Sequence, residues 1–516
     1  SSFDQDLGRH LRIGEIIWQT HNVPLTNLFS YTYPDFPFIN SHWLFELLLY
    51  LGQQTIGLQA ILVLKVIIFL LSVWLVLKII PKNQYLLLPF GFIFLHTLRE
   101  RPELRPEVFS FLFTALTIYI LETKKKFLYF LPFLQLIWVN THIYFIVGLI
   151  LQAIYLLSHI RSGKLKLAGI IFVLSVSASL INPSGLKGLL NPLMYGSNYG
   201  YTIVENQTMF LLESINFRDP NFLFVKICFG LILISFIIAL IKKRFSIKNF
   251  GLAGFGMTLA LMNVRSFPYL ALISLPAVLA NFGSAKWHKL LIWITIPLIL
   301  LESFYYLNGD YYKYINSDVS PGIEFKESGK EALDFVLVNN LPQPIFNNFD
   351  IGSYITYRGW PKYKIFVDGR PGEYPKEFFQ QVYIPMQSDP QKFVEIDKQY
   401  GFKTIIFSIT DQTPWGKAFL QSIVKNPDWK TVYIDDFIII LMKDAHGLKV
   451  IDLANLNPDS RGFESYLSYL RLSLFLAQTG SMQSAQKFAE KGLSLFPESP
   501  LGNAMFGINA SNKFSW

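Results

Sequence analysis

The sequence predicts a polytopic α-helical membrane domain, followed by a soluble extracytoplasmic α/β domain and a short helical tail. Of its 516 residues, 52% are hydrophobic and 16% are charged, and its mean hydropathy of +0.34 excludes an ordinary soluble protein. Long apolar runs occupy residues 58–308, and beyond Leu307 the runs shorten to strand length. The net charge of +9 comes mainly from short loops between apolar runs, so we expect it to orient the protein in the bilayer and expect no nucleic-acid partner.

Ten apolar runs are candidates for membrane-spanning helices, although several are shorter than the roughly 20 residues that a bilayer requires. They lie at about 58–80, 84–98, 107–122, 127–140, 142–159, 167–182, 221–241, 250–264, 267–282 and 289–308. The segment 43–57 is too short and too polar for a span, so it is predicted to be an interfacial helix.

The loops between these runs differ in basic content, which predicts the topology. Five loops are rich in basic residues, at Lys78 and Lys82, at 124–126, at Arg161, Lys164 and Lys166, at 242–248, and at Lys286 and Lys289. Basic loops face the cytoplasm. The opening segment, residues 99–107, the turn at 140–142, the loop 183–220, Arg265 and everything after about 309 then share the external side.

These observations divide the chain into four parts. Residues 1–57 form an external loop with interfacial helices, and 58–308 form a transmembrane bundle of nine or ten spans. Residues 309–445 form the extracytoplasmic α/β domain, and 446–516 form the tail. The only cysteine, Cys228, lies inside an apolar run, which excludes a disulfide framework and a thiolate metal site.

The α/β domain is predicted from short apolar runs that alternate with helical stretches. Strands are expected at 345–349, 352–357, 364–369, 403–409 and 431–443, and helices near 328–340, 375–382, 390–400 and 415–425. Asp368-Gly369 favours a turn over a catalytic site.

The tail from about Gly462 has two helix-like segments joined by Gly480, with the spacing of a tetratricopeptide repeat. One repeat cannot bury its own face. It must therefore pack on the preceding domain, on further chain, or on a protein partner.

Polar chemistry is concentrated in the first forty-odd residues, ahead of the first long apolar run. This stretch holds Asp4, Asp6, Arg9, His10, Arg12, Glu15, His21, His42 and Glu46. Asp6 is placed to N-cap an amphipathic helix from about Leu7 to about Thr20, suited to a bilayer surface. Either Asp4 and Asp6 only cap this helix, or they belong to a functional site.

Further candidates lie in other segments on the same external side. The segment 99–107 carries two Arg-Pro-Glu units, and the guanidinium groups of Arg101 and Arg105 suit a lipid phosphate. The alternative is an anchor loop neutralised by its own acidic residues. Lys65, near the outer end of its span, either snorkels to the surface or pairs with a lipid phosphate. His142 is expected to bind substrate or to make an ordinary hydrogen bond rather than to bind metal, since no histidine pair has metal-ligand spacing on a helix.

Glu205 and Arg265 complete the set of substrate-binding candidates. Glu205 lies in the middle of the external loop 183–220 and is the second acidic candidate, against the alternative of a solvated loop carboxylate. Arg265 lies at the top of two spans, where it is placed to close the same cavity.

The order of motifs in the opening stretch resembles that of a known protein family. Asp4-x-Asp6 is followed by Gly-x-His-Leu-Arg-x-Gly-Glu and then by Val-Pro, Phe-Ser-Tyr-Thr and His-Trp-Leu. This order resembles the first external loop of polytopic membrane glycosyltransferases with the GT-C fold, above all bacterial members of unassigned substrate. Their better-understood relatives are protein mannosyltransferases and oligosaccharyltransferases, which take sugars from polyprenyl-phosphate or polyprenyl-diphosphate donors outside the membrane. The resemblance covers residues 1 to about 310 and, less sharply, the soluble part.

The resemblance has implications for site and cofactor. In the GT-C fold an acidic residue of the first external loop lies at the catalytic centre, which maps onto Asp4 or Asp6. An acidic residue near the place of Glu205 faces that loop. Asp4-x-Asp6 also resembles the metal-binding pattern of oligosaccharyltransferases, so Mg²⁺ or Mn²⁺ is a candidate cofactor, although monophosphate-donor relatives need not use one. One span is expected to be missing before the Ser-Ser start.

Three classes of function compete. Glycosyl transfer from a phosphate leaving group needs a base for the acceptor and cations for the phosphate, which explains why acidic and basic groups gather on one side. We therefore expect transfer of a sugar from a polyprenyl-phosphate-linked donor to a glycan, protein or lipid acceptor, at the inner membrane of a bacterial cell. Asp6 is the expected base, Asp4 assists, and Arg9, His10, Arg12 and His42 bind substrate. A transporter would carry polar residues deep in its spans and show internal repeats, and a scaffold would leave both aspartates without a role.

Overall fold

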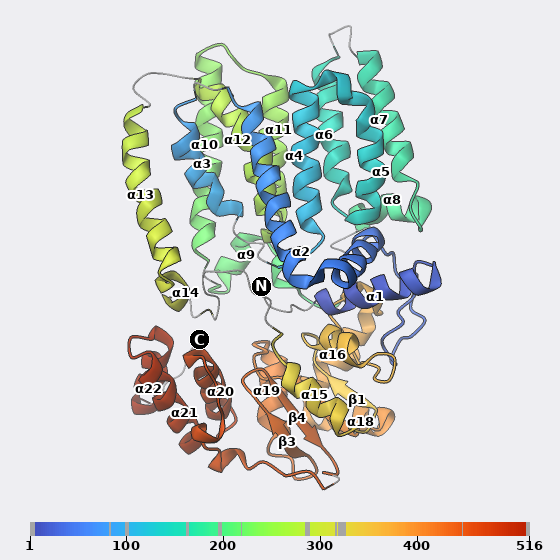
Figure 1. Ribbon diagram of the computed structural model, residues 1–516, viewed down its shortest axis with the longest axis vertical. Coiled ribbons are helices and arrows are strands. Elements are labelled where there is room, and N and C mark those ends of the chain that lie inside the picture. Colours follow the sequence, from blue (N-terminus) through green and yellow to red (C-terminus); the bar gives the residue numbers. More distant parts are fainter. Residues whose placement is uncertain are drawn as a thin grey trace.

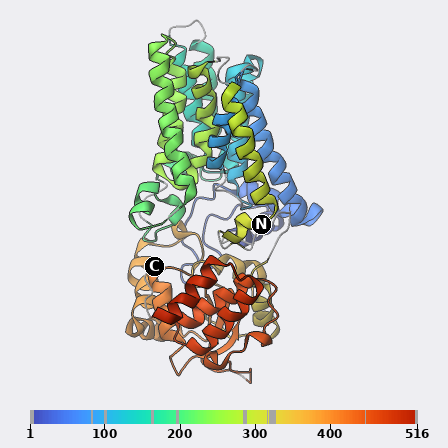
Figure 2. The same cartoon turned by 90° about the vertical axis from the view of Figure 1, so that its left-hand side faces the viewer.

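The structure, a computed structural model, describes residues 6–81, 84–98, 103–160, 165–194, 199–217, 219–283, 289–314, 317, 327–445 and 447–511. The molecule has two parts along its long axis: a bundle of apolar helices and, below it in Figure 1, a smaller part of helices and strands. The view turned by 90° shows the same division (Figure 2). Helices α1 (Leu7–Thr20) and α9 (Met209–Ser214) lie at the level between the two parts.

The bundle is built from helices that run alternately away from the lower part and back toward it (Figure 1). They are α2 (Trp43–Ile79), α3 (Leu87–Leu95), α4 (Glu107–Thr123), α5 (Leu131–Thr141), α6 (Phe145–Ser158), α7 (Leu165–Ser179), α10 (Pro220–Ile241), α11 (Ile247–Met262), α12 (Phe267–Phe282) and α13 (Lys289–Leu307). Short 3₁₀ turns adjoin them: η1 (His96–Leu98), η2 (Lys125–Phe130), η3 (Val204–Asn206) and η4 (Val264–Ser266). Each predicted apolar run overlaps one of these helices. The short helix α8 (Gly185–Met194) stays near the end that faces the lower part, where Asn191 donates to Ser41.

Within the described residues, four helical stretches are long and apolar enough to cross a membrane by length and composition. They are Trp43–Ile79, Pro220–Ile241, Val264–Phe282 and Lys289–Leu307. Shorter apolar helices accompany them at Leu87–Leu98, Phe145–Ser158, Leu165–Ser179 and Ile247–Met262. The protein is therefore a multi-pass membrane protein. α12 lies at the centre, since 83% of its apolar window is buried, whereas α13 lies at the edge with 6% buried.

α2 is bent at Gly57, which has a φ of 79° and a non-helical ψ of 160°. The half before Gly57 packs on α1 and departs in direction from the second half, while its interfacial location stays a prediction. The two helices approach closely at Gly14, which has no side chain. A Cβ atom added there would lie only 2.0 Å from the backbone oxygen of Glu46. This close crossing fixes α1 against the end of the bundle.

The lower part contains a four-stranded sheet of β1 (Ile345–Asn347), β2 (Thr404–Ser408), β3 (Lys430–Ile434) and β4 (Ile438–Met442). Its order is β1-β2-β4-β3, with β1 and β2 parallel and the other neighbours antiparallel. Phe346 pairs with Ile405, and Ile406 pairs with Ile440. The helices around it are α15 (Lys330–Val338), α16 (Gly352–Gly359), α17 (Ile384–Ser388), α18 (Pro390–Tyr400) and α19 (Pro414–Ile423), whereas α14 (Asp310–Tyr314) lies at the end of α13. The run predicted at 431–443 is a hairpin of two strands.

Two predicted strands are wrong. Residues 352–357 lie in α16, because a short apolar run does not distinguish a strand from a buried helix. A Cβ at Gly352 would lie 2.1 Å from the Val367 backbone oxygen, so the start of this helix packs directly on the chain at 367–368. Residues 364–369 do not form a named strand. Instead, Ile365 bridges to Ser30, which attaches the opening loop to the lower part.

The tail forms helices α20 (Tyr466–Gln478), α21 (Met482–Leu495) and α22 (Pro500–Ser511). Gly480, with a φ of 93°, turns the chain between α20 and α21. Phe475 and Phe488 are buried in the same apolar cluster as Phe346 and Phe407 of the sheet. These two helices thus pack on the preceding part of the chain, and their classification as a repeat stays a prediction.

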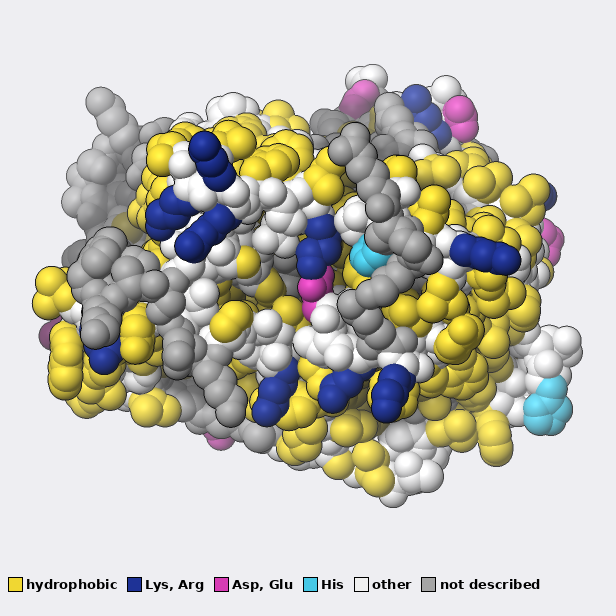
Figure 3. Space-filling model, turned by 90° about the horizontal axis from the view of Figure 1, so that it is seen from above, with side chains coloured by type: hydrophobic (Ala, Val, Ile, Leu, Met, Phe, Trp, Pro, Cys, Tyr) yellow, Lys and Arg dark blue, Asp and Glu magenta, His cyan; other side chains and the backbone are white. Residues whose placement is uncertain are grey.

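The two ends of the bundle carry different charges. The helix directions place the described basic residues of these loops, among them Lys78, Lys166 and Lys243, at the end remote from the sheet, and Figure 3 shows Lys and Arg side chains on this face. The starts of α2, α4 and α12 lie at the opposite end, next to α1. The segregation agrees with the predicted topology, whereas the side of the membrane that each end faces stays a prediction.

Candidate functional site

Buried and half-buried charges converge at the end of the bundle that faces the sheet. They come from α1, the first half of α2, the starts of α4 and α12, and the turn η3. We call them the charge cluster, which comprises Asp6, Arg9, Glu46, Arg105, Glu107, Glu205 and Arg265.

Asp6 occupies the N-cap position of α1, but its side chain accepts no capping hydrogen bond. Its carboxylate pairs instead with Arg9 at 2.8 Å, one turn along the helix, and with Arg105 at 3.5 Å. Burial by itself raises the pKa of Asp6, yet the guanidinium groups of Arg9 and Arg105 outweigh burial and hold that pKa well below its usual value. Asp6 is therefore an ionised member of an ion network at neutral pH and does not act as a helix cap.

Arg105 joins segments that are far apart in the sequence. Its Nη1 donates to both carboxylate oxygens of Glu205 at 3.0 Å, across 100 residues. Arg265 donates to Glu205 at 3.0 Å and lies 3.2 Å from Glu107. Arg105 directly precedes Pro106 and α4, and Arg265 lies in η4 directly before α12. Both guanidinium groups are thus carried by helix starts, which hold their backbones in fixed positions.

The turn that carries Glu205 is held on both sides. Tyr201 stacks on Phe349 of the lower part at a ring-centroid distance of 4.2 Å. After the turn, Val264 N donates to Gln207 O at 3.0 Å. Glu205 itself is the most exposed member of the charge cluster, with 32% of its side chain accessible.

Three histidines lie side by side next to the charge cluster, and we call them the histidine row: His10, His42 and His142. The ring centroids of His10 and His42 lie 5.8 Å apart, and those of His42 and His142 lie 5.4 Å apart. Glu46 accepts from or donates to His10 Nδ1 at 2.9 Å, and Ser110 does the same for His142 Nδ1 at 2.7 Å. Both ends of the row are thereby hydrogen-bonded.

Burial is the largest cause that lowers the pKa of His10 and of His42. The positive charge of Arg9 lowers the pKa of both residues further, and His142 lowers that of His42. Both imidazoles are therefore neutral near pH 7, which leaves each one able to accept a proton.

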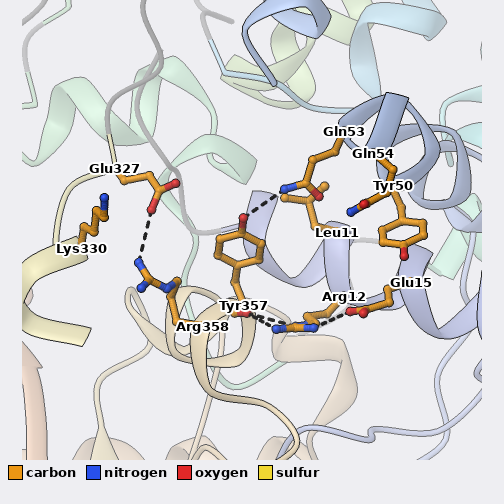
Figure 4. Close-up of a pocket in the computed structure, with 10 residues that line it drawn as sticks. All are labelled: Leu11, Arg12, Glu15, Tyr50, Gln53, Gln54, Glu327, Lys330, Tyr357 and Arg358. Atoms are coloured by element: carbon orange, nitrogen blue, oxygen red, sulfur yellow. Dashed lines mark hydrogen bonds and ion pairs between the residues drawn. The ribbon is translucent and has the colours of Figure 1, made fainter. Parts of the chain in front are cut away.

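Two predicted substrate-binding residues, Arg12 and Lys65, lie outside both the charge cluster and the histidine row. Arg12 is turned about 200° around α1 from His10, so it faces away from the row. It pairs with Glu15 and donates to Tyr357 O of α16 at 3.0 and 2.6 Å. Figure 4 shows it in a polar pocket of 390 Å³ between α1, α2 and α16. Lys65 is half-buried in the apolar half of α2, about two turns beyond Gly57.

Asp4 and Arg101 lie outside the described residues. Asp6, Arg9, Arg105, Glu205 and Arg265 are brought together in the charge cluster, and His10, His42 and His142 form the adjacent row.

Sequence reasoning did not choose Glu46 and Glu107 as site residues. Glu46 is 1% exposed and accepts from Asn40 Nδ2 at 2.8 Å as well as contacting His10. Glu107 is 4% exposed and lies beside Arg265. The available signal was a carboxylate near the start of an apolar helix, because such a group is buried only when it is paired.

The described carboxylates do not fit a metal centre. Within the described residues, no group of three or more His, Cys, Asp and Glu side chains is arranged to hold a metal ion. The carboxylate oxygens of Asp6 and Glu205 face guanidinium groups, whose positive charge stands where a cation would bind. A metal site formed with Asp4 stays a prediction.

The fold matches solved structures of an archaeal oligosaccharyltransferase. One is AglB from Archaeoglobus fulgidus in complex with an inhibitory peptide and a dolichol-phosphate, at 12% identity and a TM-score of 0.51, covering 81% of this chain and 67% of that chain. The apo form of the Archaeoglobus fulgidus oligosaccharyltransferase matches at 12% identity and 0.50, with the same coverage. The form tethered to an acceptor peptide containing the NVT sequon matches at 12% and 0.50, covering 86% of this chain and 71% of that chain.

No protein-family model matches the sequence, and no curated protein matches it. At 12% identity the structural matches establish the fold alone. They confirm the predicted GT-C-like fold, with a distant similarity to oligosaccharyltransferases.

Proposed function

We propose that this chain, with its oligosaccharyltransferase-like fold, is a membrane glycosyltransferase. It transfers a sugar from a polyprenyl-phosphate-linked donor to an acceptor on the extracytoplasmic side. The observation that carries the proposal is the convergence of Arg9, Arg105 and Arg265 with carboxylates at the one end of the bundle that faces the sheet. Function is argued from this site, because the fold alone hosts more than one activity.

Arg105 and Arg265 are proposed to bind the donor phosphate. Glycosyl transfer leaves a phosphate with growing negative charge, and fixed guanidinium groups stabilise such charge through paired hydrogen bonds. Both already hold one anionic group, the carboxylate of Glu205, at 3.0 Å. Glu205 is also the most exposed carboxylate of the charge cluster, so a phosphate displaces it at the lowest desolvation cost.

A groove for the polyprenyl chain supports a lipid-linked donor. A cavity of 1040 Å³ lies between α2, α3, α12 and α13, and most of its lining is apolar, including Phe69, Leu95 and Leu275. The lining reaches Leu98 at the end of η1, on the side of the bundle that faces the sheet. An isoprenoid tail in this groove would place its phosphate toward the charge cluster.

The extracytoplasmic location is supported by the distribution of basic loops. The Lys-rich and Arg-rich loops lie at the end remote from the charge cluster, and such loops stay on the cytoplasmic side. The site and the sheet then face outward, in the inner membrane of a bacterial cell.

The decisive experiment is turnover by the purified protein in lipid nanodiscs. Undecaprenyl-phosphate and undecaprenyl-diphosphate carriers of radiolabelled hexoses are supplied with a membrane extract as acceptor, and the released carrier is measured. The expected result is release of carrier with transfer of label, strongly reduced in Arg105→Ala and retained in Arg12→Ala. Arg12 is the matched control, because it is also an ion-paired arginine but lies outside the charge cluster. An inactive wild type with every donor would overturn the proposal.

The same assay tests whether the reaction depends on a divalent metal ion bound with Asp4. Assays with EDTA and with added Mn²⁺ separate a metal-dependent reaction from one that relies on guanidinium groups alone. The neutralised carboxylates of the charge cluster favour retained activity in EDTA.

A further inference from the structure

His42 differs from its two neighbours in the histidine row. His10 is hydrogen-bonded to Glu46, and His142 is hydrogen-bonded to Ser110. Among the described residues, neither ring nitrogen of His42 has a hydrogen-bond partner, and its ring is half-buried. The middle imidazole of the row therefore has uncommitted nitrogen atoms.

The residues around His42 are, by contrast, held by hydrogen bonds of the backbone and of neighbouring side chains. His42 N donates to Asn40 Oδ1 at 3.0 Å. Its neighbour Ser41 accepts from Asn191 at 3.1 Å, and Trp43 donates to Asn140 at 2.7 Å. A side chain with free polar atoms on a fixed frame is the arrangement that a reacting group needs, because it loses little freedom when substrate arrives.

Asp6, the base expected from the sequence, is poorly arranged to accept a proton. One carboxylate oxygen faces Arg9 at 2.8 Å, and the other faces Arg105 at 3.5 Å. Protonating Asp6 would break two ion pairs inside a half-buried network. Accepting a proton at His42 breaks no hydrogen bond to its ring.

We propose that His42 takes the proton from a hydroxyl acceptor as the new glycosidic bond forms. This inference rests on the proposed function. As the acceptor oxygen bonds to the anomeric carbon of the sugar, the O–H proton passes to a ring nitrogen of His42. The bond between the anomeric carbon and the phosphate oxygen breaks, and its electron pair leaves with the polyprenyl phosphate. Asp6, Arg9 and Arg105 then act as a fixed electrostatic frame and leave proton transfer to His42.

The surroundings of His42 suit both states of its ring. His10, Arg9 and Asp6 face it from α1, Glu107 from α4, and His142 from the chain after α5. Burial, His142 and Arg9 lower its pKa, so the resting ring is neutral. Glu107 and Asp6 raise its pKa and would stabilise the imidazolium that forms during the reaction.

The first test replaces His42 and measures turnover, using the donor found active with the wild type. His42→Gln is expected to lower kcat by about 10²–10⁴-fold with little change in donor KM, the range contributed by general-base catalysis. His42→Gly is expected to regain activity when free imidazole is added, which a purely structural role would not produce. His159→Gln is the matched control, because His159 lies at the remote end of the bundle.

The second test is independent of turnover. Diethyl pyrocarbonate carbethoxylates neutral, uncommitted imidazoles, and the modified residues are mapped by mass spectrometry on the intact protein in nanodiscs. Within the histidine row, His42 is expected to react at least tenfold faster than His10 and His142. Equal rates for the three residues would overturn the inference.

The remaining outcomes separate the two proposals. A wild type that turns over while His42→Gln keeps full activity overturns the role of His42 and leaves the glycosyltransferase in place. A wild type inactive with every donor overturns the proposed function, and the base assignment with it. If His42→Gly is unfolded and imidazole does not restore its activity, this variant says nothing about catalysis. The kcat of His42→Gln then decides, because glutamine has a similar polarity and preserves the fold.

Discussion

Both ends of the bundle carry charged side chains next to apolar helices, but the described charges differ in their burial and pairing. At the end remote from the sheet, Lys78, Lys126 and Lys243 are exposed. At the other end, Arg105 and Glu107 are buried and are tied to carboxylates or guanidinium groups from distant segments. An exposed charge next to a span orients the protein in the membrane, whereas a buried and paired charge indicates a candidate functional site.

The largest expected effect concerns the side of the membrane that each end of the bundle faces, and its readout is all-or-none. If the two ends face opposite sides, a reporter fused after Lys126 and a reporter fused after Asp310 must report from opposite compartments. Alkaline phosphatase and green fluorescent protein fusions measure this directly, since each is active on one side only. If both reporters were active on the same side, the prediction that the two ends face opposite sides of the membrane would be wrong.

The next effect is on turnover. Arg105→Ala is expected to lower turnover by about 10²–10³-fold, because it removes a fixed donor for the developing phosphate charge. Its stability loss should stay below the roughly 3–5 kcal/mol of an isolated broken buried pair, since Asp6 keeps Arg9 and Glu205 keeps Arg265. Kinetics and thermal unfolding in detergent, with Arg12→Ala alongside, measure the two effects. A stable Arg105→Ala protein with unchanged donor KM and kcat would reduce Arg105 to an anchor.

A third prediction asks what burial does to a carboxylate without a paired cation. Asp435 lies 8% exposed in the turn between β3 and β4, where burial raises its pKa from 3.8 to about 6. A raised pKa contributes stability below pH 3.8 that is lost as pH rises through about 6. Relative to wild type, Asp435→Asn should therefore gain stability between pH 4 and pH 7, by at most about 3 kcal/mol.

The comparison between Asp435 and Asp6 is the point of this experiment. The paired Asp6 has a lowered pKa and keeps its contribution at neutral pH, so the two carboxylates have opposite pH dependence. Thermal unfolding across pH measures the slope, with the exposed Asp428→Asn as control. A slope that Asp435→Asn leaves unchanged contradicts the assignment.

The smallest effect belongs to the remote end. Lys126→Ala is expected to change turnover less than twofold and stability by less than about 0.5 kcal/mol, because an exposed lysine without a buried partner contributes little. Turnover and thermal unfolding are measured for Lys126→Ala and for Arg105→Ala under the same conditions. The ratio of the two losses in turnover then measures the difference between the ends. A loss comparable to that of Arg105→Ala would mean that the basic end takes part in the reaction.

Local sequence patterns determined much of this protein. Apolar run lengths located the helices of the bundle, the amphipathic pattern located α1 at Leu7–Thr20, and loop charge separated the two ends. The same polarity argument gathered Asp6, Arg105, Glu205 and Arg265 on one side, because each lies in a loop or helix start between apolar runs. These properties depend on near neighbours in the chain, so they are readable without the fold.

Only the tertiary structure decided which of these groups pair and which are buried. Arg105 meets Glu205 across 100 residues, Arg12 turns away to Tyr357, and Glu46 holds His10. The run 352–357 becomes helix α16 because its backbone packs on residues 367–368 and on α1, which a short apolar pattern does not encode. Whether a carboxylate is ionised, or an imidazole has a free nitrogen, depends on desolvation and on partners brought by distant segments. Those quantities exist only once the helix ends have packed together.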